Sequence, residues 1–185
     1  MTNQSHPHLM TRRNFLLSAA QAIAGLSVLS PLEVLSKIIP DNKISFFHTH
    51  TGEQFEFRYL GRKCPPVTKK RLFSFLRDFR TGDVHPIDFR LMEILVKIQK
   101  ETGSKGVYEV ISGYRSPKTN NFLRTGSSGV AKKSFHLKGK AIDVRLRDLP
   151  TADLRDVAIS LRAGGVGYYA KSDFVHLDTG NVRSW

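Results

Sequence analysis

The N-terminal segment limits how much of this chain can fold into a globular domain. After Arg12 and Arg13, residues 14–32 carry no charged side chain and are mostly apolar, with serine and glutamine interspersed. The stretch 15–29 has no polar face at helical spacing, so it lacks the pattern of a helix packed on a soluble core. Of the 185 residues, 41–185 remain. That length suits one domain and leaves little room for a second.

The same segment has the features of a targeting signal. A paired arginine followed by Phe-Leu and a soft apolar region resembles a twin-arginine export signal. We therefore assign residues 1–40 to such a signal. It predicts a periplasmic protein that the twin-arginine machinery exports already folded. No A-x-A triplet lies beside a polar mature start, so retention of the segment as an N-terminal anchor stays open.

The composition of the chain excludes several classes of protein. It holds 29 Lys and Arg against 16 Asp and Glu, a net charge of +13, and 40% of its residues are hydrophobic. A disordered chain would be poorer in apolar residues, so this chain can build a core. Its one cysteine, Cys64, excludes an internal disulfide framework and a cysteine-rich zinc site. The positive charge permits nucleic acid, an anionic membrane or an acidic polymer as a partner and does not choose among them.

Strand and helix patterns are mixed along the chain without the regular alternation of βαβ units. Two β-rich runs flank Thr51-Gly52 and predict a hairpin. This order predicts an α+β domain with a small, mainly antiparallel sheet flanked by helices. The expected strands are 43–49, 53–59, 107–111, 140–146, 166–170 and 174–177, and the expected helices are 68–80, 86–101, 116–124 and 151–162.

Two histidine–carboxylate clusters lie at predicted junctions of strand and loop. In the first, His136 precedes a turn and Asp143 lies on the strand after it; in the second, Asp173 lies three residues before His176. Two imidazoles and one carboxylate form a ligand set suited to catalytic zinc, with a fourth position left for water. Asp173 is the nearest candidate to accept a proton from that water. From spacing alone, the alternative that both histidines are hydrogen-bonded loop and core residues stays open.

Three motifs together resemble those of a known superfamily. The string S-x-H-x-x-G-x-A-x-D, which begins at Ser134 and ends at Asp143, resembles the zinc motif of the D-alanyl-D-alanine peptidase superfamily. Residues 112–116, Ser-Gly-Tyr-Arg-Ser, are similar to its S-G-Y-R-S element, and Asp173-x-x-His176 is similar to its acid-x-x-His element. The superfamily includes dipeptidases of the vancomycin-resistance type, phage endolysins and penicillin-insensitive murein endopeptidases. The resemblance implies the zinc D-Ala-D-Ala peptidase/Hedgehog-like fold, with a catalytic domain at 41–185.

The resemblance also implies a role for each matched residue. One Zn²⁺ per chain would be bound by His136, Asp143 and His176. Asp173 would be the general base and then pass the proton to the leaving amine. Arg115 would contact the substrate and stabilise the oxyanion of the scissile carbonyl.

For several side chains near the motifs, the sequence leaves two roles open. Ser134 orients the substrate or bonds the loop backbone. Asp178 shares a strand face with His176 by period two, so it bonds that histidine or serves as a structural cap. Of Tyr168 and Tyr169, one is expected in the cleft and the other in the core.

A closer resemblance lies within the superfamily. Residues 123–136, 162–169 and 174–180 resemble a murein endopeptidase, which implies cleavage of links between two meso-diaminopimelate residues. Phe174 is a departure, because some relatives carry a histidine there, and its loss leaves Asp173 as the base. Lysines 132, 133, 138 and 140 flank the zinc motif, where they either hold an anionic stem peptide or form a solvated surface.

The leading hypothesis is an exported zinc endopeptidase that hydrolyses peptide cross-links in the bacterial cell wall. Its expected partners are cross-linked stem peptides and the export machinery, with no nucleic acid and no obligate protein partner. One alternative is a D,D- or L,D-carboxypeptidase that trims stem ends with the same site. Another is a non-catalytic, zinc-stabilised cell-wall binding module, against which Asp173 and Arg115 argue because a structural metal site needs neither.

Overall fold

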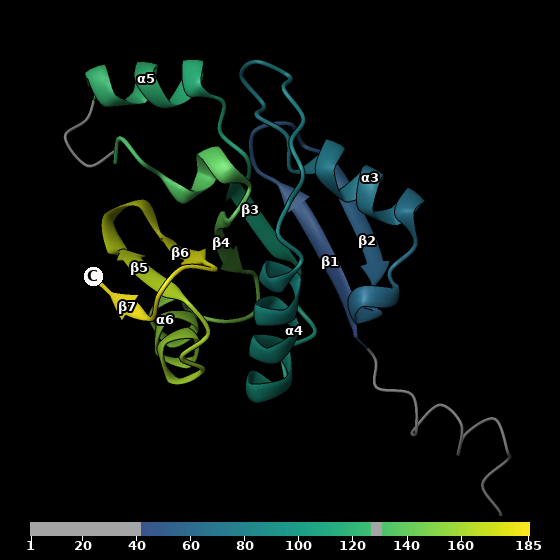
Figure 1. Ribbon diagram of the computed structural model, residues 1–185. Coiled ribbons are helices and arrows are strands. Elements are labelled where there is room, and N and C mark those ends of the chain that lie inside the picture. Colours follow the sequence, from purple (N-terminus) through teal and green to yellow (C-terminus); the bar gives the residue numbers. More distant parts are fainter. Residues whose placement is uncertain (1–41, 127–130) are drawn as a thin grey trace, which may run out of the picture. The chain divides into compact units, whose positions relative to one another are not determined.

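The computed structural model describes residues 42–126 and 131–185, in which seven strands form one sheet (Figure 1). The predicted export signal at 1–40 lies outside the described residues. The strand order across the sheet is β2-β1-β3-β4-β6-β5-β7. The strands are β1 (Lys43–His48), β2 (Gln54–Arg58), β3 (Tyr108–Ser112), β4 (Ala141–Leu146), β5 (Gly165–Tyr169), β6 (Phe174–Asp178) and β7 (Arg183–Ser184).

Four α-helices accompany the sheet in the described residues. They are α3 (Pro66–Phe75), α4 (Arg90–Thr102), α5 (Pro117–Gly126) and α6 (Thr151–Ser160). Three short 3₁₀ helices, η1 (Gly61–Lys63), η2 (Phe135–Lys138) and η3 (Ala170–Ser172), lie in the connections. The predicted α+β class is confirmed. Within the described residues, no helix combines the length and apolarity needed to cross a membrane.

The prediction of a small, mainly antiparallel sheet is wrong. The sheet has seven strands and is mixed, because β3 pairs with β1 in parallel and β7 pairs with β5 in parallel. The physical reason lies in the long connection between β2 and β3, which carries α3 and α4. This connection brings the chain back to run beside β1 in the same direction, which a hairpin connection cannot do.

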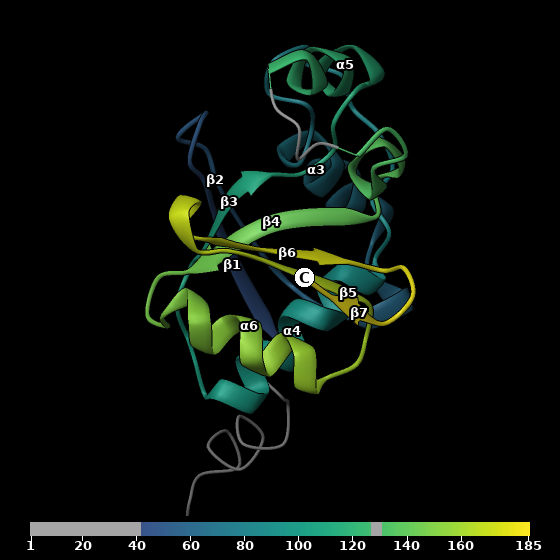
Figure 2. The same ribbon diagram turned by 90° about the vertical axis from the view of Figure 1, so that its left-hand side faces the viewer.

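One face of the sheet is covered by α4 and α6 (Figure 2). On β4 and β6, Ile142, Val144, Val175 and Leu177 point into this core and are at most 1% exposed. Because side chains alternate along a strand, the neighbours of these residues lie on the opposite face, which we call the site face. The helices contribute matching apolar side chains, among them Leu91, Met92, Leu95 and Ile98 of α4 and Leu154 of α6.

The segment before α4 ties the core to the site face. The Asp88 amide donates to the carbonyl of Gly139 (2.8 Å), and the Thr179 hydroxyl donates to the Asp88 carboxylate (2.8 Å). The chain before Arg90 is thus bonded to the turn after η2, so the helix begins four residues later than the predicted start at residue 86. The predicted helix 68–80 likewise ends early, at Phe75.

Candidate metal centre

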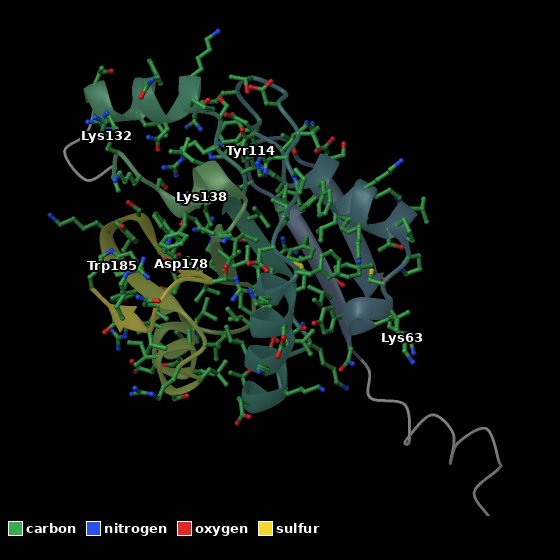
Figure 3. The ribbon with its side chains drawn as sticks, in the orientation of Figure 1. Lys63, Tyr114, Lys132, Lys138, Asp178 and Trp185 are labelled. Atoms are coloured by element: carbon green, nitrogen blue, oxygen red, sulfur yellow. The ribbon has the colours of Figure 1, made fainter. Side chains whose placement is uncertain are left out.

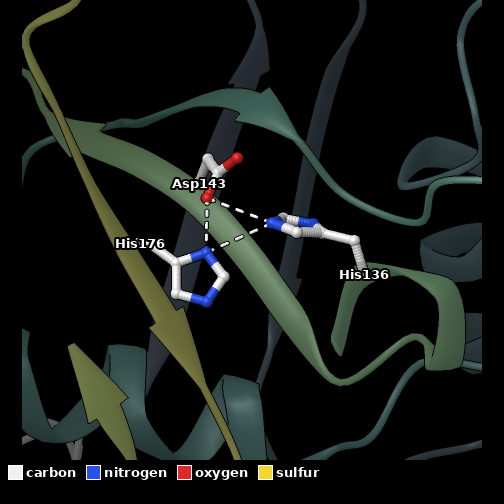
Figure 4. A group of neighbouring side chains, drawn as sticks. All are labelled: His136, Asp143 and His176. Atoms are coloured by element: carbon white, nitrogen blue, oxygen red, sulfur yellow. Dashed lines mark hydrogen bonds and ion pairs between the residues drawn. The ribbon is translucent and has the colours of Figure 1, made fainter. Parts of the chain in front are cut away.

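Three predicted ligands converge at one point on the site face (Figure 4). The His136 Nε2 atom lies 3.2 Å from an oxygen of Asp143 and 3.2 Å from the Nδ1 atom of His176. The third side of this triangle, from His176 Nδ1 to the same Asp143 oxygen, is 2.8 Å. All three side chains are buried, and one atom of each faces the common centre.

The sheet and the η2 turn position these ligands. Asp143 on β4 and His176 on β6 are direct partners in an antiparallel pair, which brings their side chains together on one face. His136 enters from η2, where the Ser134 hydroxyl accepts a hydrogen bond from the His136 amide at 3.3 Å. Gly139 ends η2 with a left-handed backbone, φ 60°, and an added Cβ there would collide with the carbonyl oxygen of Pro86.

The ring nitrogens that face away from the centre are also bonded. His136 Nδ1 lies 2.7 Å from the carbonyl oxygen of Gly113, and His176 Nε2 lies 3.1 Å from the carboxylate of Asp178. A carbonyl and a carboxylate can only accept, so the proton of each neutral ring is on the outward nitrogen. The inward nitrogen of each ring then offers its lone pair to a metal, an arrangement typical of histidine ligands.

Asp178 combines the two roles that the sequence left open. Its carboxylate is fully buried and, besides His176, it accepts from the amides of Gly165 (3.2 Å) and Gly180 (2.8 Å). The guanidinium of Arg183 bonds it with both terminal nitrogens, at 3.1 and 2.6 Å. Burial acts to raise the pKa of Asp178, but these donors, His176 and Arg183 above all, hold it well below its usual range.

The electrostatics of the cluster favour positive charge at its centre. Burial acts to lower the pKa of His176, but the hydrogen bonds and charges of Asp143 and Asp178 outweigh it and raise the pKa to about 9. Burial acts to raise the pKa of Asp143, yet the two imidazoles hold it well below its usual range. A cluster that holds a proton this firmly also suits a cation, which competes with protons for the same ligand atoms.

The donor set fits a tetrahedral metal ion such as zinc. Zinc bonds nitrogen and oxygen ligands at about 2.0–2.2 Å, so tetrahedral ligand atoms lie about 3.3–3.6 Å apart. The three distances between ligand atoms, 2.8–3.2 Å, are slightly shorter than that spacing. Three protein ligands leave one position for water or substrate, as catalytic zinc sites do.

A cleft of about 380 Å³ opens over the cluster. Arg115 reaches it from the segment after β3, with a side chain only 12% exposed and one guanidinium nitrogen 3.7 Å from an Asp143 oxygen. Burial lowers the pKa of Arg115, and its Nε has no hydrogen-bond partner among the described residues. The lining comprises Arg115, Ala131, Lys133, Ser134, Phe135, His136, Asp143, Tyr169, Phe174, His176, Arg183 and Trp185.

Asp173 is not brought to the cluster. Its side chain is 59% exposed, and its carboxylate oxygens lie 3.2 Å from Arg145 and 2.7 Å from the Thr151 hydroxyl. It lines a separate hollow beside Glu109 and is absent from the lining of the cleft. This geometry does not support the predicted role of Asp173 as proton acceptor. Asp173 precedes β6 and ends η3 with a left-handed backbone, φ 50°, so the strand pairing that places His176 does not place Asp173.

The structure also decides between residues that the sequence could not separate. Tyr169 lines the cleft, whereas Tyr168 packs against the hydrophobic core with Arg155 over its ring at 4.6 Å. Of the four flanking lysines, Lys133 lines the cleft. Phe174 also lines the cleft, and its place two residues before His176 on β6 is the sequence signal that predicts this strand face.

The fold and this cluster define a class: a protein whose mixed sheet carries, on one face, three buried side chains that could hold one metal ion. Comparison with known proteins identifies the family, because the family described as "Peptidoglycan L,D-endopeptidase MepK" matches residues 39–185, and the chain belongs to it. The resemblance predicted from the sequence motifs is thereby confirmed, and the chain is a peptidase.

Curated relatives agree with this assignment. The chain is 38% identical to peptidoglycan L,D-endopeptidase MepK of Escherichia coli (strain K12) over 175 residues, which cover 94% of this chain and 96% of that protein. It is 42% identical to the probable peptidoglycan L,D-endopeptidase MepK of Haemophilus influenzae over 173 residues, covering 91% and 92%.

Proposed function

We propose that this protein is a zinc-dependent peptidoglycan endopeptidase that hydrolyses cross-links between two meso-diaminopimelate residues. The observation that carries the proposal is the convergence of His136, Asp143 and His176 in a cleft, in a chain of this family. The L,D-endopeptidase names of the relatives support the bond type, since a link between two meso-diaminopimelate residues joins an L-centre to a D-centre.

In this proposal the protein's own groups divide the work. His136, Asp143 and His176 would hold the ion, which, when bound, acts as a Lewis acid and makes water nucleophilic at neutral pH. Asp178 keeps the His176 ring turned toward the centre. Arg115, largely buried beside Asp143, provides a fixed positive charge for the oxygen of the scissile peptide.

The charge of the cleft suits an anionic substrate. Arg115, Arg183 and Lys133 line it, and its one lining carboxylate, Asp143, belongs to the ligand set. Stem peptides with free carboxylates supply the opposite charge. Ser134 points its hydroxyl to its own loop, where it fixes the turn that carries His136.

We also propose that the chain reaches the periplasm through the twin-arginine route, on the basis of residues 1–40. Cell fractionation of the chain and of its Arg12→Lys/Arg13→Lys variant tests this. We expect the wild-type chain in the periplasmic fraction and the variant in the cytoplasmic fraction. If the two proteins distribute equally between the fractions, the chain does not use this route.

The function is tested with a digest of purified muropeptides, separated by chromatography and identified by mass. The full chain is used after chelation, after zinc is restored, and as a His176→Ala variant. Only the zinc-restored wild type is expected to convert dimers joined through two meso-diaminopimelate residues to monomers. Loss of terminal residues from monomers with dimers intact identifies a carboxypeptidase instead. Zinc binding without any conversion identifies a binding module.

A further inference from the structure

The cleft holds a polar group that the roles above do not use. The charged groups of the lining already have roles. Asp143 belongs to the ligand set, and Arg183 is paired with Asp178. Arg115 faces the peptide, and Lys133 adds positive charge for an anionic stem peptide. Among the described residues of the lining, Tyr169 supplies the one aromatic hydroxyl group. A phenol is a good hydrogen-bond donor and adds no charge to the cleft.

The strand register places Tyr169 on the site face next to the cluster. On the β5–β6 pair, Gly167 is opposite His176 and Tyr169 is opposite Phe174. Tyr169 therefore follows Gly167 on the same face, about 6.6 Å along the strand, while Tyr168 between them points to the core. Adjacent residues of one strand thus carry the same side chain to opposite sides of the sheet.

Two aromatic contacts fix the Tyr169 ring. It stacks on Phe174, with ring centroids 4.6 Å apart and planes 15° apart. The indole nitrogen of Trp185 donates a hydrogen bond to the Tyr169 hydroxyl at 3.1 Å, and the Trp185 ring lies 5.4 Å from the His176 ring. Gly167 makes room for this arrangement, since an added Cβ would lie 2.6–2.9 Å from Trp185 ring atoms.

The Trp185 bond determines what the hydroxyl can do. Indole nitrogen is a donor only, so the Tyr169 oxygen is the acceptor and its own proton remains free to donate. The position of Trp185 is itself set by backbone bonds, because Tyr168 donates to its carbonyl (2.9 Å) and it donates to Val166 (3.1 Å). In Figure 3, Trp185 lies at the same end of the sheet as Asp178. A donor fixed before substrate arrives requires little reorganisation during the reaction.

We propose that Tyr169 is a catalytic residue, whose hydroxyl donates a hydrogen bond to the scissile carbonyl oxygen as negative charge develops there. Trp185 is the positioning residue that orients this hydroxyl. The inference rests on the proposed endopeptidase function and adds a second donor beside Arg115. It also assigns a task to the aromatic wall of the cleft that no motif in the sequence identifies.

The test compares Tyr169→Phe with Tyr168→Phe in the zinc-loaded full chain, on the cross-linked dimer that wild type consumes. Tyr169→Phe removes one hydroxyl and is expected to lower kcat about 10- to 100-fold, since single oxyanion donors contribute up to about 100- to 1,000-fold. Zinc content and melting temperature should match wild type. Tyr168→Phe, the matched control, should stay within about twofold. A Tyr169→Phe enzyme with wild-type kcat overturns the proposal, as does a change confined to KM.

Trp185→Phe tests the positioning role, because it keeps an aromatic ring and removes the N–H donor. It is expected to lower kcat about 3- to 10-fold alone and to have no further effect when combined with Tyr169→Phe. An equal loss in both backgrounds shows that Trp185 does not act through Tyr169. If wild type itself consumes no dimer, the proposed function has failed; if wild type is active and Tyr169→Phe equals it, only the present inference has failed.

Discussion

At the scale of single residues, three aspartates near the site have different environments and therefore different tasks. Asp143 is buried among the imidazoles and offers one oxygen to the centre. Asp178 is buried behind His176, with Arg183 and two backbone amides on its oxygens. Asp173 is exposed, and Arg145 and Thr151 occupy its carboxylate. The spacing of the motifs alone does not show which of the three aspartates is buried at the centre, which supports a ligand and which is exposed.

The surroundings of Asp173 predict that its charge is dispensable for the reaction. We expect Asp173→Asn to keep kcat within about threefold of wild type, because Asp173 is absent from the lining of the cleft. If Asp173 were the general base, the loss would be about 100-fold or more, since a neutral amide cannot accept the proton. The amide oxygen can still accept from Arg145, and the amide NH2 group can donate to the Thr151 hydroxyl. Steady-state kinetics on the cross-linked dimer measure this. A loss of 100-fold with zinc content unchanged would restore Asp173 to the role of base.

The three convergent ligands could be predicted because their motifs fix both residue type and spacing, and His136, Asp143 and His176 do meet. The rest of the site depends on strand parity and register. Whether Tyr168 or Tyr169 faces the cleft follows from the pairing of β5 with β6, and pairing partners lie far apart in sequence. Trp185 enters the cleft through β7, whose two residues are too few to give a periodic pattern.

At the scale of elements, the η2 turn is the part of the site that relies on backbone conformation. It presents His136, and it closes at Gly139, whose carbonyl accepts from the amide of Asp88. The turn keeps its shape through Gly139, through the bonds of Ser134 and Asp88, and through the Arg115 amide, which donates to the carbonyl of His136 (3.2 Å). The ligand on η2 is thus held by a short local structure, and the other two by the sheet.

We expect Gly139→Ala to destabilise the fold by about 2–4 kcal/mol. An L-residue in the left-handed region costs about 1–2 kcal/mol, and the collision with Pro86 adds an overpacking cost of similar size. Because His136 lies in the same turn, zinc affinity should fall as well. Gly126→Ala is the control, since no atom lies within 4 Å of its added Cβ. Urea unfolding and a zinc competition titration measure the two effects; equal curves for both variants contradict the prediction.

The elements differed in how well they could be predicted. The hairpin of β1 and β2 has a local turn and alternating strands, and α4 has six buried apolar residues on its inner surface, so both leave a clear pattern. The parallel pairing of β3 with β1 has no such local signal, because it depends on the path of the 59 residues between the two strands. The predicted end of α3, at residue 80, lies too late in the sequence because Leu76 and Phe79 continue the apolar spacing beyond Phe75, the last helical residue.

At the scale of the whole molecule, the pH dependence of stability has a source outside the three-ligand cluster. His48 is fully buried at the end of β1, between the rings of Phe75 and Phe79. Its Nδ1 accepts from the His50 amide at 3.3 Å, and its Nε2 has no hydrogen-bond partner among the described residues. Burial, with His50 adding to it, lowers the pKa of His48 from 6.5 to about 4.

The contribution of His48 to the stability of the fold is therefore lost in mild acid. The unfolded chain binds a proton at His48 below pH 6.5, and the folded chain does not until about pH 4. The contribution is complete above pH 6.5 and is lost as pH falls to 4, with about 2 kcal/mol lost by pH 5. Urea unfolding of the full chain at pH 7.5 and 5.0 measures it. His48→Asn, which does not titrate, should show a correspondingly smaller change between the two pH values; an equal change in both proteins contradicts the assignment.

The carboxylate of Asp178 has a consequence for how the protein matures. It orients His176, and it is held in turn by amides of the turns at Gly165 and Gly180 and by Arg183. The orientation of His176 is thus completed by residues that follow all three ligands in the sequence. An ion that arrives before these residues have folded meets an unfinished site, and selection among competing metals begins only once they are in place.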